Sequence, residues 1–188
     1  MVSIIMPIRN EADFIERAIK SILDNDYPAG KMEIIVVDGM SNDGTREIVQ
    51  RLSQADGRIR ILDNLRRIVP TAMNIGLKAA RGEQFIRIDG HAEIPKDFII
   101  KSVQCLAEHP EAWVAGGPIK TVADTYTGRA IAAAMRSPIG VGDSRFRLGD
   151  YEGWVDTLAF GTHHKWVVDK VGYFDEELVR NQDDEFNL

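Results

Sequence analysis

The fold is decided by the stretch EIIVVDGMSNDGT, residues 33–45. Its four consecutive aliphatic residues, Ile34–Val37, predict a strand covered on both faces of a sheet, because such a strand has no solvent-facing side to carry polar residues. Asp38 comes directly after them, so the strand presents a carboxylate at the rim of the sheet. Asn42 or Asp43 can then cap the next helix. The stretch therefore predicts a strand, a polar loop and a helix in succession.

The same alternation continues on both sides of this stretch. Short runs rich in Ile and Val alternate with longer runs that have helical spacing, and this order predicts an α/β fold in which crossover helices join parallel strands. Pro70 suits the first turn of one helix, and Gly82 suits its end. We expect strands at 2–6, 33–37, 59–62, 84–88 and 113–115, and helices at 11–23, 43–52, 70–80 and 95–108.

The alternation of predicted strands and helices ends after Pro118. Five glycines interrupt residues 121–153, a pattern typical of a functional loop or lid, or of a disordered segment. We expect a short strand at 154–159 and a helix at 164–171 beyond it. The chain then stops in an amphipathic pattern without a cap. We therefore expect one domain over residues 1–188, cut off at its C-terminus within a longer protein.

Composition excludes several classes of protein. The 188 residues carry 29 acidic and 23 basic side chains, a formal net charge of −6, which argues against a nucleic-acid partner. No apolar run approaches the ~18 residues of a membrane span, and the N-terminal run is too short for a signal peptide. The single cysteine, Cys105, favours a reducing compartment, and we expect it to be a buried small hydrophobe. These features predict a cytoplasmic protein.

Two polar clusters lie just after the first two predicted strands, where α/β sheets bind ligands. They are PIRNE, residues 7–11, and DGMSNDGT, residues 38–45. The clusters contain neither the G-x-G-x-x-G dinucleotide fingerprint nor an EF-hand loop. For Asp43 we favour a turn-capping role, and for Asp38 a ligand-binding role.

Two further acidic clusters complete the candidate site. In IRIDGHAE, residues 86–93, Asp89 ends a strand and His91 comes two residues later. Such ligands suit Mn²⁺ or Mg²⁺ bridged to a diphosphate, although His91 can equally be a solvated loop histidine. In RNQDDEF, residues 180–186, Asp183 and its acidic neighbours either favour a helix N-terminus or supply a general base.

Four segments together resemble the family-2 glycosyltransferases with the GT-A fold, closest to bacterial enzymes of succinoglycan and exopolysaccharide biosynthesis. The resemblance implies a mixed, mainly parallel sheet flanked by helices. It also implies an inverting transfer from a nucleotide-sugar donor such as a UDP-sugar to a saccharide or polyprenyl-linked acceptor. The full-length protein would then work at the cytoplasmic face of the membrane, attached through segments absent here. The segments are VSIIMPIRNEADFIERAIKSIL (2–23), IIVVDGMSNDGT (34–45), AMNIGLKAARGEQFIRIDGH (72–91) and NQDDEF (181–186).

The resemblance also assigns roles to residues of the donor site. Asp89 opens the motif of two acids that holds a divalent cation, Mn²⁺ or Mg²⁺, on the diphosphate, and His91 replaces the second acid. Met73 stands where many members have an arginine, so Arg66, Arg67 or Lys78 would supply the phosphate charge, and we select Arg66. The nucleotide pocket would be lined by Pro7, Arg9, Glu11 and Asp38.

On the acceptor side, the resemblance assigns Asp183 as the catalytic base, with Gln182 in place of the usual Glu. Trp154 and Asp184 would face the acceptor, although a core role for Trp154 is equally consistent with the sequence. His163 and His164 are better explained as helix-capping or surface residues than as diphosphate contacts.

Two other functions remain open from the sequence. A sugar nucleotidyltransferase has a similar sheet, but it would be expected to carry a glycine-rich phosphate loop after the first strand, and PIRNEADF contains no glycine. A non-catalytic nucleotide-sugar-binding module is favoured by His91 and Gln182, the two departures from the family pattern.

Overall fold

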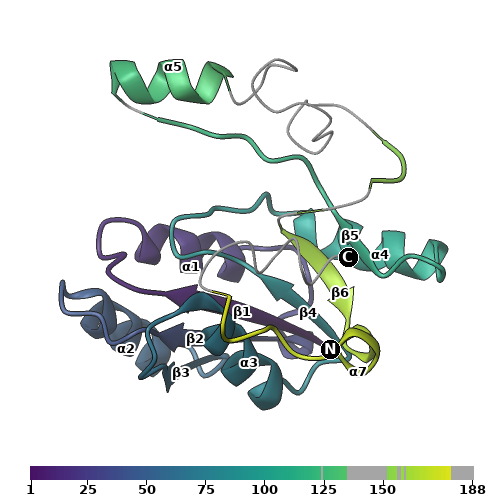
Figure 1. The fold of residues 1–188 in the computed structure, drawn as a ribbon, viewed down its shortest axis with the longest axis horizontal. Coiled ribbons are helices and arrows are strands. Elements are labelled where there is room, and N and C mark those ends of the chain that lie inside the picture. Colours follow the sequence, from purple (N-terminus) through teal and green to yellow (C-terminus); the bar gives the residue numbers. More distant parts are fainter. Residues whose placement is uncertain (124, 135–151, 156–157, 159, 179–188) are drawn as a thin grey trace.

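The computed structural model describes residues 1–123, 125–134, 152–155, 158 and 160–178. In this part of the chain, a six-stranded sheet has the order β3-β2-β1-β4-β6-β5 (Figure 1). The parallel strands are β1 (Val2–Ile8), β2 (Met32–Asp38), β3 (Ile59–Asp63) and β4 (Gln84–Arg87). β6 (Gly161–His164) is antiparallel to both β4 and β5 (Val114–Gly116). The predicted mixed, mainly parallel sheet is therefore confirmed.

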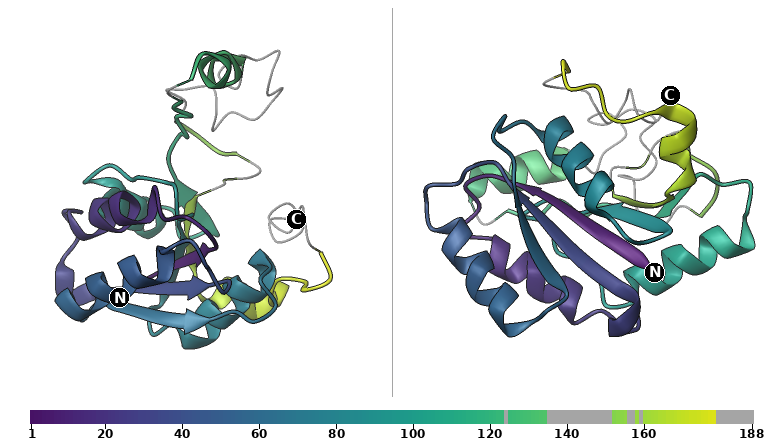
Figure 2. Two further views of the ribbon diagram at one scale, coloured as in Figure 1. Left: turned by 90° about the vertical axis from the view of Figure 1, so that its left-hand side faces the viewer. Right: turned by 90° about the horizontal axis from the view of Figure 1, so that it is seen from below.

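Helices cover both faces of the sheet (Figure 2). α1 (Ile15–Leu23), α2 (Thr45–Ala55) and α4 (Phe98–Glu108) pack against one face, and α3 (Val69–Ala79) and α7 (Trp166–Val171) against the other. Alternate residues of β1 point to the two faces, so that Ile4 packs with the α1 side and Ile5 with the α3 side. Each fully buried isoleucine contributes roughly 1.5–3 kcal/mol through apolar burial. A short 3₁₀ helix, η1 (Ala29–Lys31), precedes β2.

Three expectations from the sequence need correction. The predicted strand at 154–159 is not found in its described residues, 154, 155 and 158, and the strand lies at Gly161–His164 instead. Residues 156, 157 and 159 lie outside the described residues. The observed strand begins at a glycine because β5 lies so close that a Cβ at residue 161 would collide with the Val114 side chain. Residues 121–153, predicted to be irregular, include the helix α5 (Tyr126–Ala134), which lies apart from the sheet in Figure 1. Cys105 is exposed, not buried.

A buried carboxylate, that of Glu33, joins the N-terminal ends of the parallel strands. Glu33 accepts hydrogen bonds of 2.7 Å from Ser3 Oγ, from the Arg81 backbone N–H and from Arg60 Nη2. Burial by itself would raise the pKa of the Glu33 carboxyl, but these hydrogen bonds outweigh it and hold the pKa below its ordinary value. This edge is therefore tied together by charge-assisted hydrogen bonds.

Within the described residues, the structure contains no helix with the length and apolar character that a bilayer crossing requires.

Candidate active site

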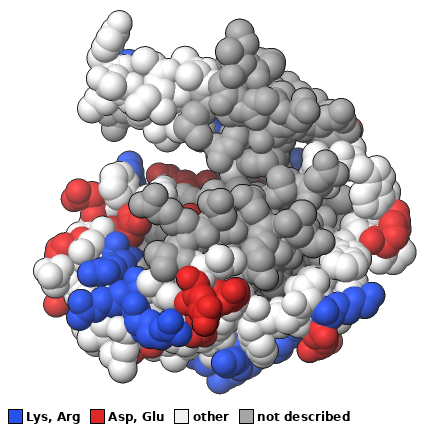
Figure 3. Space-filling model, viewed as in Figure 1, with Lys and Arg blue, Asp and Glu red and all other residues white. Residues whose placement is uncertain are grey.

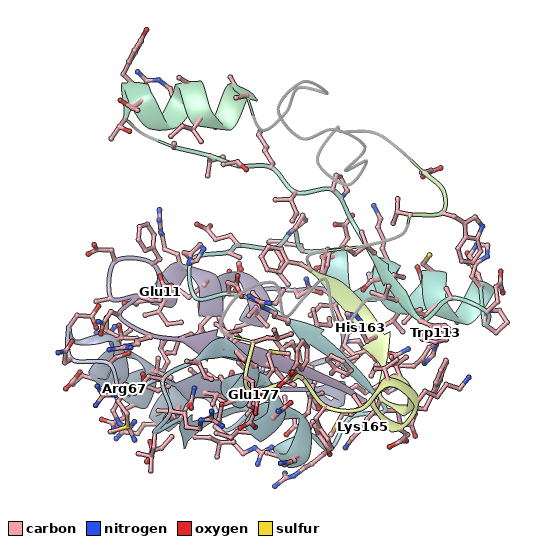
Figure 4. All side chains as sticks on the ribbon, viewed as in Figure 1. Glu11, Arg67, Trp113, His163, Lys165 and Glu177 are labelled. Atoms are coloured by element: carbon pink, nitrogen blue, oxygen red, sulfur yellow. The ribbon has the colours of Figure 1, made fainter. Side chains whose placement is uncertain are left out.

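A cavity of about 200 Å³ lies at the opposite edge, where β1, β2 and β4 end. In Figure 4, Glu11 and Arg67 mark this edge, while Trp113 and Lys165 lie at the other end of the molecule. Parallel strands bring their C-terminal ends together, so loops far apart in the sequence form one wall. The cavity is lined by Pro7, Ile8, Arg9, Glu11, Gly39, Asn64, Arg67, Ile68, Val69, Ala72, Arg87, Asp89 and His91.

Two loops are joined along one side of the cavity by hydrogen bonds between side chains and backbone. The Asn10 backbone N–H donates to Ser41 Oγ at 2.9 Å, and Asn10 Oδ1 accepts from the Asn42 backbone N–H at 3.0 Å. The Glu11 backbone N–H donates to Thr45 Oγ1 at 2.7 Å. Asn10 adopts a positive φ of 56°, which asparagine tolerates better than most residues. The residues after β1 are therefore held in place by the loop after β2.

Asp43 has the turn-capping role that we favoured from the sequence, but the residue at the N-cap of α2 is Gly44, and neither Asn42 nor Asp43 occupies that position. Its Oδ1 accepts from the backbone N–H and the hydroxyl of Thr45, and its Oδ2 accepts from the Ala12 backbone N–H. The hydrogen bond from the Thr45 side chain is the main reason that the pKa of the Asp43 carboxyl lies below its ordinary value. Asp43 thus holds the turn that leads into α2 and also joins the two loops.

Asp38 is fully buried behind the cavity and is not among the residues that line it. Its carboxylate accepts from the backbone N–H and hydroxyl of Ser41, at 3.1 and 2.6 Å, and from Arg46 Nη1 at 3.0 Å. Arg46 also pairs with Asp63 at 2.6 Å, and these two carboxylates raise the pKa of Arg46. In this structure Asp38 therefore organises the loop, while its neighbour Gly39 forms the cavity wall.

The end of β4 brings a carboxylate and an imidazole into the cavity. Asp89 Oδ1 accepts a hydrogen bond from Arg87 Nε at 2.9 Å. His91 Nδ1 lies 2.9 Å from Glu11 Oε1, and Glu11 belongs to the loop after β1. Five of the predicted site residues line this one cavity: Pro7, Arg9, Glu11, Asp89 and His91.

The basic side chain that lines the cavity is not the one that we selected from the sequence. Arg66 does not line the cavity, because it forms a 2.6 Å ion pair with Glu176. Its neighbour Arg67 does line the cavity and has a positive φ of 63°, uncommon for an arginine. Lys78 lies over the ring of Tyr173. Arg67 is thus the candidate that sequence reasoning named but did not select, since two adjacent arginines look alike in a sequence.

The loop that carries Arg67 is shaped by Asn64, which is almost fully buried. Asn64 accepts from the Arg67 backbone N–H and donates through Nδ2 to the Ile68 carbonyl, and its own backbone N–H donates to the Asp38 carbonyl. Figure 3 shows Lys and Arg side chains gathered on the side of the molecule where Figure 4 labels Arg67. An acidic protein thus has a local basic surface beside this cavity.

The remaining predicted residues lie elsewhere. Asp183, Asp184 and Gln182 fall outside the described residues. Trp154 is 62% exposed and does not line the cavity. Its ring lies edge-on to that of His109, with 5.8 Å between the ring centroids. Met73 is fully buried. His163 and His164 are part of β6, where His163 stacks on Phe85, so neither of them caps the next helix.

The residues of the cavity fit a divalent cation that shares its coordination with a ligand. No group of three metal-ligating side chains is present in the described part of the chain. Asp89 and His91 are a carboxylate and an imidazole, a donor set that suits Mn²⁺. A cation bound through one or two protein groups completes its shell with phosphate oxygens and water. The nearby arginines supply further positive charge for such a ligand.

Comparison with known proteins agrees with this geometry. The chain is 33% identical over 187 residues to the succinoglycan biosynthesis protein ExoA of Rhizobium meliloti (strain 1021), which covers 98% of this chain and 56% of that protein. It is 28% identical over 194 residues to a dolichyl N-acetyl-alpha-D-glucosaminyl phosphate 3-beta-D-2,3-diacetamido-2,3-dideoxy-beta-D-glucuronosyltransferase of Methanococcus voltae, covering 60% of that protein. The chain thus spans little more than half the length of these relatives.

Solved structures show the same architecture. Mannosyltransferase PcManGT from Pyrobaculum calidifontis, in complex with GDP-Man and Mn²⁺, matches with a TM-score of 0.74 at 25% identity, over 99% of this chain and 50% of that one. S. aureus TarS 1–349, in complex with UDP-GlcNAc, matches with a TM-score of 0.69 at 21% identity, over 99% and 52% of the two chains, a likeness of fold alone. The fold is therefore GT-A, as predicted. The model of glycosyl transferase family 2 matches residues 3–162, and the chain belongs to that family.

Proposed function

We propose that this chain is the catalytic domain of an inverting glycosyltransferase that moves a sugar from a nucleoside-diphosphate donor to a saccharide or polyprenyl-linked hydroxyl. The observation that carries the proposal is the single cavity that combines arginines with Asp89 and His91. A diphosphate needs both kinds of group, because its charge must be balanced before it can leave. The mannosyltransferase PcManGT, which has the same fold, was solved in complex with GDP-Man and Mn²⁺. That complex supports the proposal that this cavity binds a nucleotide-sugar donor and a cation.

Each group of the cavity has a physical role in the proposal. Arg9, Arg67 and Arg87 line the cavity and would attract the diphosphate, since guanidinium groups bind phosphate through paired hydrogen bonds. Asp89 and His91 would hold Mn²⁺ or Mg²⁺, which neutralises charge on the leaving diphosphate when bound. The apolar wall would exclude water and so strengthen these interactions.

The transfer step needs a base on the acceptor side. We assign it to Asp183, which takes the proton of the acceptor hydroxyl while the hydroxyl oxygen forms a bond to the anomeric carbon. The bond from that carbon to the diphosphate oxygen breaks on the opposite face, so the configuration inverts. The products are the glycosylated acceptor and the nucleoside diphosphate. Trp154 and Asp184 remain candidates for acceptor contacts. The cytoplasmic face of a membrane is the proposed place of action of the full-length protein.

Two variants test the proposal. Asp183→Asn should lower turnover by roughly 10²- to 10⁴-fold, the usual contribution of a general base, while donor affinity stays close to normal. Asp89→Ala should instead weaken Mn²⁺-dependent binding of UDP- or GDP-sugars, measured by calorimetry. Normal turnover in Asp183→Asn would refute the base, and unchanged donor affinity with and without Mn²⁺ in Asp89→Ala would refute the metal site.

An assay of the released products separates glycosyl transfer from the two other functions, the sugar nucleotidyltransferase and the non-catalytic binding module. Release of nucleoside diphosphate from the donor indicates transfer or hydrolysis, whereas release of pyrophosphate during sugar-nucleotide formation would indicate a nucleotidyltransferase. Donor binding without turnover, in a protein that includes the rest of the chain, would indicate a non-catalytic binding module.

A further inference from the structure

We infer that Glu11 is a positioning residue that fixes the tautomer of His91 and so makes this histidine a cation ligand. The inference rests on the proposed function. The observation is the 2.9 Å distance between His91 Nδ1 and Glu11 Oε1, two residues brought together from the ends of β1 and β4. Both residues line the cavity.

Glu11 is the ordered partner of this pair. Its side chain is 19% exposed, against 60% for His91. The Glu11 backbone is held by the hydrogen bond to Thr45 Oγ1. Gly90 packs so closely against Glu11 that a Cβ at residue 90 would lie 2.8 Å from Glu11 Cγ. The Glu11 backbone is therefore held by a hydrogen bond and its side chain by close packing against Gly90, so the more exposed imidazole adapts to the carboxylate.

The chemistry of the pair determines which ring nitrogen can bind a cation. An ionised carboxylate only accepts hydrogen bonds, so His91 Nδ1 must carry the proton that is shared with Glu11. In the neutral ring, Nε2 then keeps its lone pair. Histidines that ligate metals characteristically donate their other N–H to a carboxylate or carbonyl, which orients the ring and raises its basicity.

The pair also accounts for a departure from the family pattern. Where His91 replaces the second acid of the motif, the site would lose one negative charge. Glu11 supplies a carboxylate from a different loop, and this carboxylate acts through the imidazole of His91 and not as a ligand of the cation. Arg87 pairs with Asp89, and Arg17 lies 3.8 Å from Glu93, which leaves Glu11 as the carboxylate that faces His91 in the described structure.

The test compares Glu11→Gln, His91→Ala and the double variant, with Mn²⁺ as the probe in the presence of UDP or GDP. Electron paramagnetic resonance measures free Mn²⁺, and thermal melting checks that each variant folds. Glu11→Gln should weaken Mn²⁺ binding by roughly 10- to 100-fold, the usual effect of losing such a partner. His91→Ala should cost at least as much, and Glu11→Gln should add less than twofold in the His91→Ala background.

Two matched variants sharpen the result. Glu93→Gln removes a carboxylate from the same segment, one that is 57% exposed, and should change Mn²⁺ affinity by less than twofold. Gly90→Ala keeps the carboxylate but displaces it, and should weaken Mn²⁺ binding by a smaller factor than Glu11→Gln. Equal losses in Glu93→Gln and Glu11→Gln would show a general charge effect and overturn the inference.

A measurement without metal separates this inference from the proposed function. Long-range ¹H–¹⁵N spectra of the metal-free protein report which nitrogen of His91 is protonated, and should show Nδ1–H in the wild type and a mixture of tautomers in Glu11→Gln. Nε2–H in the wild type, or full additivity in the double variant, would refute the role of Glu11. Loss of Mn²⁺ binding in Asp89→Ala but not in His91→Ala would refute His91 as a ligand and leave the glycosyltransferase proposal standing.

Discussion

Strand β2 carries a buried carboxylate at each end, and the two ends serve different purposes. Glu33, near the start, accepts hydrogen bonds from Ser3, Arg60 and the Arg81 backbone. Asp38, at the end, accepts from Ser41 and Arg46. The Glu33 network ties together the N-terminal ends of the strands, whereas the loop that Asp38 holds forms the wall of the cavity.

The comparison shows that a buried, paired acid does not by itself mark a functional site. Both carboxylates satisfy the requirement that buried charges be paired. They differ in the residues that come next in the chain. Asp38 precedes Gly39, which lines the cavity and leaves Arg9 room, since a Cβ at residue 39 would lie 3.2 Å from Arg9 Cβ. Four experiments would test the difference between the two ends.

The largest expected effect is on stability at the Glu33 end. Glu33→Ala leaves Arg60 without its carboxylate and should lower the free energy of unfolding by roughly 3–5 kcal/mol, as when one partner of a buried ion pair is removed. Urea unfolding measures this loss. The affinity for donor nucleotide, measured by calorimetry on the folded fraction, should not change. A large loss of nucleotide affinity would show that the two ends are coupled.

Asp38→Asn should have a mixed effect. It removes the charge that pairs with Arg46 but leaves Asp63 as a second partner, so the free energy of unfolding should fall by about 1–3 kcal/mol. Because the loop after β2 holds Glu11 and the neighbouring residues, nucleotide affinity should fall as well. Stability and affinity are measured on the same preparation. Lost stability with wild-type affinity would mean that the Asp38 loop is structural only, like the Glu33 network.

Arg67→Ala should lower nucleotide affinity about tenfold, or ~1.4 kcal/mol, because it removes a hydrogen-bonding cation from the cavity. Arg66→Ala is the matched control, since Arg66 pairs with Glu176 on the surface instead. It should change stability by less than about 1 kcal/mol and nucleotide affinity by less than twofold. Calorimetry that ranks the two variants in the opposite order would restore Arg66 as the nucleotide contact.

The smallest expected effect is on the pH dependence of stability. The folded-state pKa of Glu33 lies below its ordinary value of 4.5. The stability that Glu33 contributes is therefore fully present above this ordinary value and is lost as the pH falls through the folded-state pKa. The difference in unfolding free energy between wild type and Glu33→Gln should narrow as the pH is lowered through this range. A difference that stays constant as the pH falls well below the ordinary value would contradict this assignment.

Much of the fold could be predicted from local patterns. The uninterrupted aliphatic run Ile34–Val37 predicted a fully covered strand, and all four residues are buried. The β5–β6 edge could not be predicted in the same way. Gly161 is required there by the close approach of Val114, a contact between distant residues that leaves no local pattern.

The candidate site, too, could be predicted only in part, because some of its features follow from local patterns and others from contacts between distant residues. Asp89 and His91 come after a strand, and their position at its C-terminal end placed them in the cavity. The preference for Arg67 over Arg66 could not be predicted, because it depends on Glu176 more than a hundred residues away. The contacts of Asp38 with Ser41 and Arg46 show that its carboxylate holds the loop after β2, and its role in ligand binding stays a prediction.

The sequence by itself determined the alternation of strands and helices, the edge of the sheet that would hold the polar residues, and the family that these segments resemble. These features depend on local periodicity and on the rule that parallel strands end at one edge. The tertiary structure decided which arginine faces the cavity, which buried acid is occupied by internal partners, and that Glu11 meets His91. These outcomes depend on contacts between loops distant in the chain, because burial and hydrogen-bond partners arise only when the loops pack together.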